Sequence, residues 1–178
     1  MTTDGEQPPA KPDDRADHVD HVLAQWHTQR PDLDVSPMAV IGRLKRLTLL
    51  MDPEMKRTFA AHGLDRASFD VLATLRRNGP DTPLTPAELM ASAMVTSGAV
   101  TQRLDRLQGR GLITRKPSPT DGRVVQVALT EEGLALIEGA LPDHLATETR
   151  LLSALSPAER EQLALLMRTL LLGLGDEF

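Results

Sequence analysis

The chain of 178 residues is long enough for one compact domain with an appendage, and it contains no cysteine. Disulfides, thiolate zinc sites and cysteine-based peroxide sensing are therefore excluded. The formal net charge of -5 argues, taken alone, against a nucleic-acid partner. No apolar signal region opens the chain, and no run reaches the roughly 18 to 20 apolar residues of a membrane span, so we expect a soluble, cytoplasmic protein.

The charge is distributed unevenly. Residues 85–129 contain six arginines and lysines and only three acids, whereas residues 1–34 carry three bases and eight acids, and residues 130–178 carry three and nine. Positive potential is thus confined to the middle of the chain. This distribution is expected if only a central module meets phosphates.

The N-terminal segment combines a tail with an amphipathic helix. Residues 1–15 have almost nothing to bury and are predicted to be disordered. Residues 16–34 hold a short helix, ended by Pro31 and marked by apolar residues at helical spacing: Val19, Val22, Leu23 and Trp26. His18 and His21, with Asp17 and Asp20, could bind a metal, but an exposed helix turn explains them equally well. We assign no metal and no cofactor.

Two helices follow in residues 35–77. Ser36 is predicted to cap a helix with Pro37 at its first position, and this helix continues to about His62, where Gly63 stops it. The next helix spans residues 66–77.

Residues 85–129 change from helical to strand-like patterning. Thr85 and Glu88 form a capping box that opens a short helix. A second helix follows, in which Val100, Leu104 and Leu107 at i, i+4 and i+7 form one buried face. Glycines 109 and 111 end it, and strands are predicted over residues 112–116 and 124–129, joined by a turn-rich tip.

A polar-faced helix followed by a β-hairpin with a cationic tip is typical of a winged helix-turn-helix. The helix fits the major groove of DNA, and Arg123 at the hairpin tip can reach the neighbouring minor groove. We therefore predict a mostly α fold with a small β-hairpin, in which residues 66–129 form the DNA-binding domain. The residues expected to contact bases or phosphates are Ser97, Thr101, Gln102, Arg103, Arg106 and Arg123.

Two acids within this domain need partners. Asp105 lies on the recognition helix and would repel phosphate, so we expect it to pair with a neighbouring arginine. Asp121 is expected to hold either the hairpin or Arg115.

The C-terminal helices end in a broad apolar face. Thr130 caps a long helix, and Ser156 with Pro157 opens the last one. The residues of this apolar face are Leu163, Leu166, Met167, Leu170, Leu171 and Leu174. Such a face is wide for a chain end, so we predict that residues 35–65 and 130–178 form a homodimer whose recognition helices read a pseudo-palindrome. The alternative is that the face closes the subunit's own core.

The wing carries a specific resemblance to the MarR family of bacterial transcriptional regulators. The family pattern Asp-x-Arg-x-x-x-Val-x-Leu-Thr appears as Asp121, Arg123, Val127, Leu129 and Thr130, preceded by the Gly-Leu-Ile-x-Arg strand at 111–115. The resemblance covers roughly residues 16–174. It implies a DNA-binding regulator of transcription and no enzymatic activity, and no catalytic motif stands out in the sequence.

Within that family the chain most resembles the urate-responsive branch represented by HucR and PecS. The branch has an extra N-terminal helix with a Trp, an Asp before the helix-turn-helix, and an Arg on both the recognition helix and the first wing strand; the matching residues here are Trp26, Asp70, Arg103 and Arg115. Their chemistry is coherent, because Trp26 offers a flat apolar wall and Arg115 a bidentate cation for a purine-like anion. Three of the four have an alternative role: Trp26 as a helix anchor, Asp70 as a structural ion-pair partner, and Arg103 as a direct DNA contact.

The sequence thus predicts a repressor that a small anion such as urate or another purine releases from DNA. Two alternatives remain open. One is a MarR-type switch driven by a different aromatic or phenolic compound, and the other is a winged-helix module that binds only proteins.

Overall fold

The computed structural model describes residues 15–79, 82–92, 100–119 and 121–176. The predicted disordered tail, apart from Arg15, lies outside them. The chain divides into two compact units, Met1–Leu50 and Met51–Phe178. Among the described residues, no helix is both long and apolar enough to cross a membrane.

The first unit pairs α1 (His18–Gln29) with the start of α2 (Ser36–Ala61), which continues into the second unit. Asp17 and Asp20 form the capping box of α1 and also accept hydrogen bonds from Arg43 of α2, at 2.8 and 2.6 Å. Val19 is buried against Gly42, where an added Cβ would lie 3.2 Å from Val19 Cγ1. The two carboxylates considered as metal ligands therefore hold the helices together.

The start of α2 differs slightly from the sequence expectation. The helix begins at Ser36 itself, and the carboxylate of Asp34 accepts hydrogen bonds from the Ser36 backbone N–H at 2.9 Å and hydroxyl at 3.1 Å. The Asp34 side chain therefore satisfies the backbone N–H of the first residue of α2, one of the groups that have no partner within the helix.

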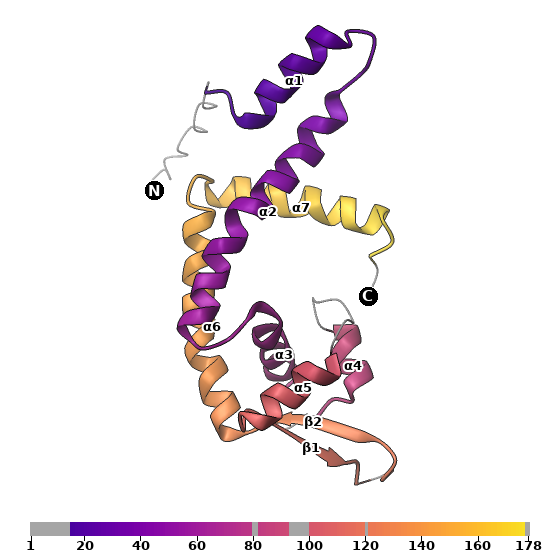
Figure 1. Cartoon of the computed structure of the whole chain (residues 1–178), viewed down its shortest axis with the longest axis vertical. Helices are drawn as coiled ribbons and strands as arrows, with labels where there is room; N and C mark the ends of the chain where they lie inside the picture. Colours follow the sequence, from indigo (N-terminus) through magenta and orange to yellow (C-terminus); the bar gives the residue numbers. More distant parts are fainter. Residues whose placement is uncertain (1–14, 80–81, 93–99, 120, 177–178) are drawn as a thin grey trace, which may run out of the picture. The chain divides into compact units, whose positions relative to one another are not determined.

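The second unit contains the remaining elements (Figure 1). They are the helices α3 (Arg66–Arg77), α4 (Pro86–Ser92) and α5 (Val100–Gly109), the strands β1 (Ile113–Pro117) and β2 (Val125–Leu129), and the helices α6 (Glu131–Leu151) and α7 (Pro157–Gly173). The strands pair antiparallel with Ile113 opposite Leu129, and Leu84 adds an isolated bridge to Val127. The mostly helical winged-helix architecture predicted from the sequence is confirmed.

The core of the second unit lies between α3, α5, the hairpin and α6. Its most buried side chains are at most 1% exposed: Leu72, Leu89, Leu107, Val127 and Ile137. Gly133 lets the first turn of α6 touch the backbone just before β1, since a Cβ there would collide with the carbonyl oxygen of Leu112. Thr130 fixes this junction, because its hydroxyl accepts from Gly133 N–H at 2.9 Å and donates to the Gly111 carbonyl at 2.6 Å.

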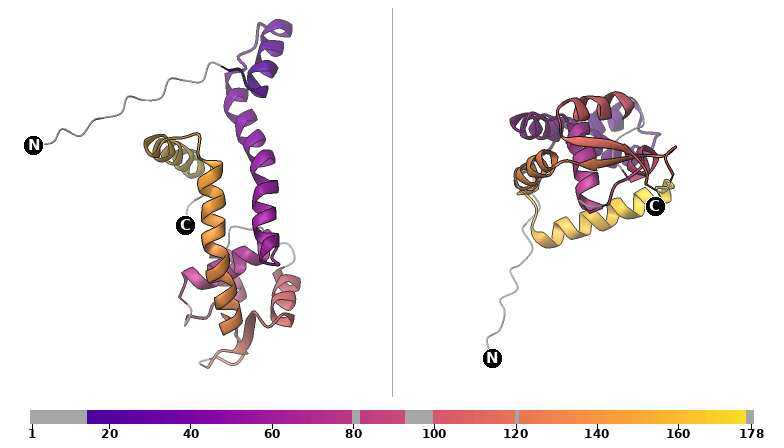
Figure 2. Two further views of the ribbon diagram at one scale, coloured as in Figure 1. Left: turned by 90° about the vertical axis from the view of Figure 1, so that its left-hand side faces the viewer. Right: turned by 90° about the horizontal axis from the view of Figure 1, so that it is seen from below.

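The end of α2 and the helix α6 lie side by side (Figure 2). The hydroxyls of Thr58 and Thr147 are 2.7 Å apart, and Arg150 donates to Glu54 at 2.8 Å. Beyond α6, the capping box of Ser156 and Glu159 opens α7, none of whose described residues is buried. The last helix is therefore joined to the unit but has no buried face.

Candidate nucleic-acid interface

The helix α5 divides its residues as the sequence predicts. Leu104 and Leu107 are 2% and 0% exposed, whereas Thr101, Gln102 and Arg106 are exposed. Ser97, the first residue expected to contact DNA, lies outside the described residues. The described part of α5 therefore presents a polar, cationic face over an apolar seam, which is what a helix in a major groove needs.

The hairpin tip is held by its own backbone and by one carboxylate. Asp121 accepts the backbone N–H of Arg123 through Oδ1 at 3.0 Å, and its carbonyl accepts from Val124 at 2.9 Å. Ser118 N–H donates to the Val124 carbonyl at 2.7 Å and closes the turn. Of the two roles expected for Asp121, it fills that of holding the hairpin, and it leaves the Arg123 side chain exposed.

An acid on α3 faces the arginines of α5. Asp65 caps α3 by accepting from Ser68 N–H at 2.7 Å, and Arg106 Nη1 lies 3.3 Å from its other oxygen. Burial raises the pKa of Asp65, but the Ser68 hydrogen bonds and the charges of Arg103 and Arg106 outweigh it and bring the pKa below its usual value. Arg106 thus has a protein partner where it was expected to meet DNA.

Arg115 is engaged by the recognition helix. Its guanidinium donates from Nε to Gln108 Oε1 and from Nη2 to Asp105 Oδ1, both at 2.5 Å. The expected pairing of Asp105 with an arginine is confirmed, and the partner comes from the wing strand β1.

The four residues of the predicted effector site occupy different settings. Trp26 belongs to α1 of the first unit and is 40% exposed. In the second unit, Asp70 is buried on α3, and α3 packs against α5, which carries Arg103. Arg103 Nη1 is buried and has no hydrogen-bond partner in the part of the chain that the structure describes. Arg115 lies on β1 and is hydrogen-bonded to α5, the helix that contains Arg103.

Sequence reasoning missed Asp65 and Gln108. The signal for Asp65 was its place just before α3, three residues ahead of Ser68, which is the spacing of a cap. The signal for Gln108 was its spacing of three from Asp105, which puts both on one helical face.

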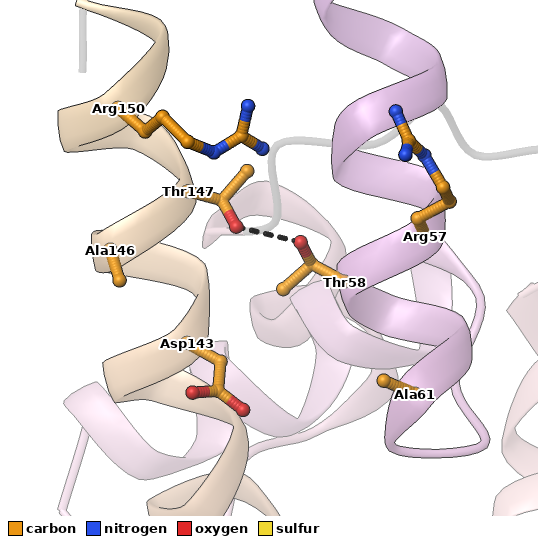
Figure 3. Close-up of a pocket in the computed structure, with 7 residues that line it drawn as sticks. All are labelled: Arg57, Thr58, Ala61, Asp143, Ala146, Thr147 and Arg150. Atoms are coloured by element: carbon orange, nitrogen blue, oxygen red, sulfur yellow. Dashed lines mark hydrogen bonds between the residues drawn. The ribbon is translucent and has the colours of Figure 1, made fainter. Parts of the chain in front are cut away.

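A cleft of about 470 Å³ lies between the last turns of α2 and α6 (Figure 3). Arg57 and Arg150 lie at one end of it and Asp143 at the other, and the bonded pair Thr58 and Thr147 crosses it. Both arginines pair with Glu54, and the Oδ2 of Asp143 faces His62 Nε2 across 2.8 Å. The charged side chains that line the cleft therefore already have partners within the chain.

A polar-faced helix, an arginine-tipped hairpin and a packed core define a winged-helix DNA-binding protein. Residues 62–124 match the model of the MarR family. The HTH-type transcriptional regulator PecS of Dickeya dadantii is 40% identical over 149 residues, covering 84% of this chain and 90% of PecS. The chain therefore belongs to the MarR family, in its branch of PecS-like and HucR-like regulators; it is a DNA-binding regulator of transcription and not an enzyme.

Solved structures agree with this placement. MarR of E. coli, as a mutant complexed with operator DNA, is 28% identical with a TM-score of 0.66, covering 77% of this chain and 95% of that one. BpsR of Bordetella bronchiseptica, whose DNA binding is regulated by 6-hydroxynicotinic acid, is 27% identical with a TM-score of 0.66, covering 74% of this chain and 91% of BpsR.

Proposed function

We propose that this protein is a homodimeric cytoplasmic repressor that binds a pseudo-palindromic operator and is released by a small anionic ligand, with urate or another purine as first candidate. The observation that carries the DNA-binding part is the exposed polar face of α5 beside a hairpin that ends in an exposed Arg123. The residues proposed to contact DNA are Ser97, Thr101, Gln102, Arg103, Arg106 and Arg123.

The dimer is supported by α7. Leu166, Leu170 and Leu171 are 62%, 43% and 49% exposed within the single chain. Burying each such side chain contributes about 1.5 to 3 kcal/mol, which favours covering the helix with a second copy. A two-fold pair of recognition helices would match half-sites about one helical turn apart.

The proposed effector site is supported by its charged side chains and by one buried nitrogen atom of Arg103. Arg103 Nη1 is buried without an acceptor among the described residues, so an incoming anion would satisfy it. Asp70 and Arg115 supply the other charges, and Trp26 offers the flat apolar wall that a purine ring stacks on. A hundredfold loss of DNA affinity needs about 2.7 kcal/mol of coupling, which rearrangement of one charged pair can supply.

A salt titration with Arg123→Ala tests the DNA contacts. The logarithm of the association constant should fall linearly with the logarithm of salt concentration, and Arg123→Ala should weaken binding about tenfold and make the slope shallower by about one. The matched control is Arg168→Ala, which removes one positive charge from α7. Equal affinities of Arg123→Ala and the control would reject the wing contact, and a flat salt dependence would favour the protein-interaction module.

Calorimetry with urate tests the effector. Heat is expected from the wild type, with binding weakened at least about tenfold in Trp26→Phe and in Arg115→Ala. Equal heats in all three proteins would reject the proposed site. If urate gives no heat and 6-hydroxynicotinic acid does, the alternative of another aromatic effector holds; BpsR, a structural relative, is regulated by that compound.

A further inference from the structure

Arg115 joins the wing to the recognition helix. It lies on β1 opposite Val127, and its side chain reaches across to α5. The hairpin tip beyond it carries Arg123, whereas the base of the hairpin is anchored by Leu112 N–H to the Leu107 carbonyl at 3.0 Å. The Arg115 contact is therefore a side-chain link between the two parts that must enter adjacent grooves.

The acceptors on α5 are matched to a guanidinium. Asp105 and Gln108 are three residues apart and lie on one helical face. Arg115 donates to them through two different nitrogens, Nη2 and Nε, each at 2.5 Å. Because the guanidinium is planar, two such bonds fix both the distance and the direction of β1 relative to α5.

The burial of this link is unequal. The Arg115 side chain is only 28% exposed, whereas that of Asp105 is 55% exposed. Asp105 thus remains an acid on a surface that faces phosphates, where by charge alone it opposes DNA binding. The unfavourable effect of this acid on DNA binding requires a compensating benefit. The bond between Asp105 and Arg115 supplies one.

We propose that Asp105 and Gln108 are positioning residues that orient the wing on the recognition helix through Arg115, so that Arg123 meets the minor groove while α5 is in the major groove. The inference rests on the proposed contact of Arg123 with DNA. It predicts that removing the negative charge of Asp105 weakens DNA binding, the opposite of the electrostatic expectation.

The test measures DNA binding of the full-length chain without effector, on a duplex selected from random-sequence DNA by the protein. Asp105→Asn and Gln108→Ala should each lower affinity about five- to tenfold, and Arg115→Lys should do the same although it keeps the charge. The matched control is Glu161→Gln, which neutralises an exposed acid of α7 and should leave affinity unchanged. Thermal unfolding checks that each variant is folded. If Asp105→Asn does not fold, the binding measurement on Gln108→Ala replaces it as the test.

A double-mutant cycle separates positioning from a general defect. In an Arg123→Ala background, Asp105→Asn should change affinity less than about twofold, because the contact it positions is already gone. Higher or unchanged affinity for Asp105→Asn alone, or a loss that adds fully to that of Arg123→Ala, would overturn the inference. If Arg123→Ala itself has no effect, the proposed wing contact fails, and the inference fails with it.

Discussion

The helices α5 and α7 belong to the same unit and place their apolar residues in opposite ways. Leu104 and Leu107 of α5 are almost fully buried, and its polar residues are exposed. On α7 none of the described residues is buried, and Leu166 is 62% exposed. The first helix has completed its packing within the chain and offers hydrogen-bonding groups to an outside partner, whereas the second offers mainly hydrocarbon.

This difference indicates what kind of partner suits each helix. Hydrogen-bonding and cationic groups recognise the edges of base pairs and the phosphates, where water is displaced only in part. Exposed leucines gain free energy only when another apolar surface removes them from water.

The largest effect is expected from charging the apolar face of α7. Leu166→Glu with Leu170→Glu should weaken the proposed dimer at least about 100-fold, because two leucines per subunit that the dimer would bury are replaced by charges. Size-exclusion chromatography with light scattering measures the oligomeric state, and DNA affinity should fall in parallel. Gln162→Glu adds charge at a polar position of the same helix and should leave the assembly intact. A double variant that stays dimeric would assign α7 another role.

A smaller effect should follow from filling the close contact between α6 and the backbone of Leu112, just before β1. Gly133→Ala places a Cβ against the Leu112 carbonyl and should lower the free energy of unfolding by about 2 kcal/mol or more. Gly139, on the same helix, has nothing within 4 Å of an added Cβ, so Gly139→Ala should raise it by about 0.5 to 1 kcal/mol. Urea unfolding measures both, and equal destabilisation would show that α6 does not depend on this close approach.

On the polar face of α5, we expect Asp65 and the DNA phosphates to compete for Arg106. Asp65→Asn keeps a capping side chain on α3 but removes the charge, so DNA affinity should rise about two- to fivefold at low salt. The increase should disappear in an Arg106→Ala background. Weaker binding by Asp65→Asn would mean that the carboxylate orients Arg106 and does not compete for it.

The smallest effect concerns acid stability. The pKa of Asp65 is lowered in the folded chain, so its contribution is fully present above the pKa of the unfolded chain, about 3.9, and is lost as the pH falls through the folded-state pKa. The free energy of unfolding measured between pH 6 and 3 should therefore decline more steeply for the wild type than for Asp65→Asn. Parallel declines would show that the carboxylate makes no net contribution.

The elements of the second unit were predictable because their signals are local. The capping residues Thr85, Thr130 and Ser156 each bond to a group three residues ahead, and the buried Leu104 and Leu107 of α5 follow a spacing of three residues. Such interactions are complete within one or two turns of chain. Their residue types and spacing therefore carry the information without reference to the rest of the molecule.

The partners of the charged residues were not predictable in the same way. The sequence indicated that Asp105 needs an arginine, but four arginines lie within ten residues of it, and only the reversal of the chain between α5 and β1 brings Arg115 back to Asp105. Asp65 meets Arg106 across 41 residues, and Thr58 meets Thr147 across 89. The helices, the hairpin and the family could be predicted from the amino-acid sequence, because periodicity, caps and short motifs are local properties of the chain. The charged partners follow from the tertiary fold, because ion pairing has no sequence period and depends on which side chains the packed core brings together.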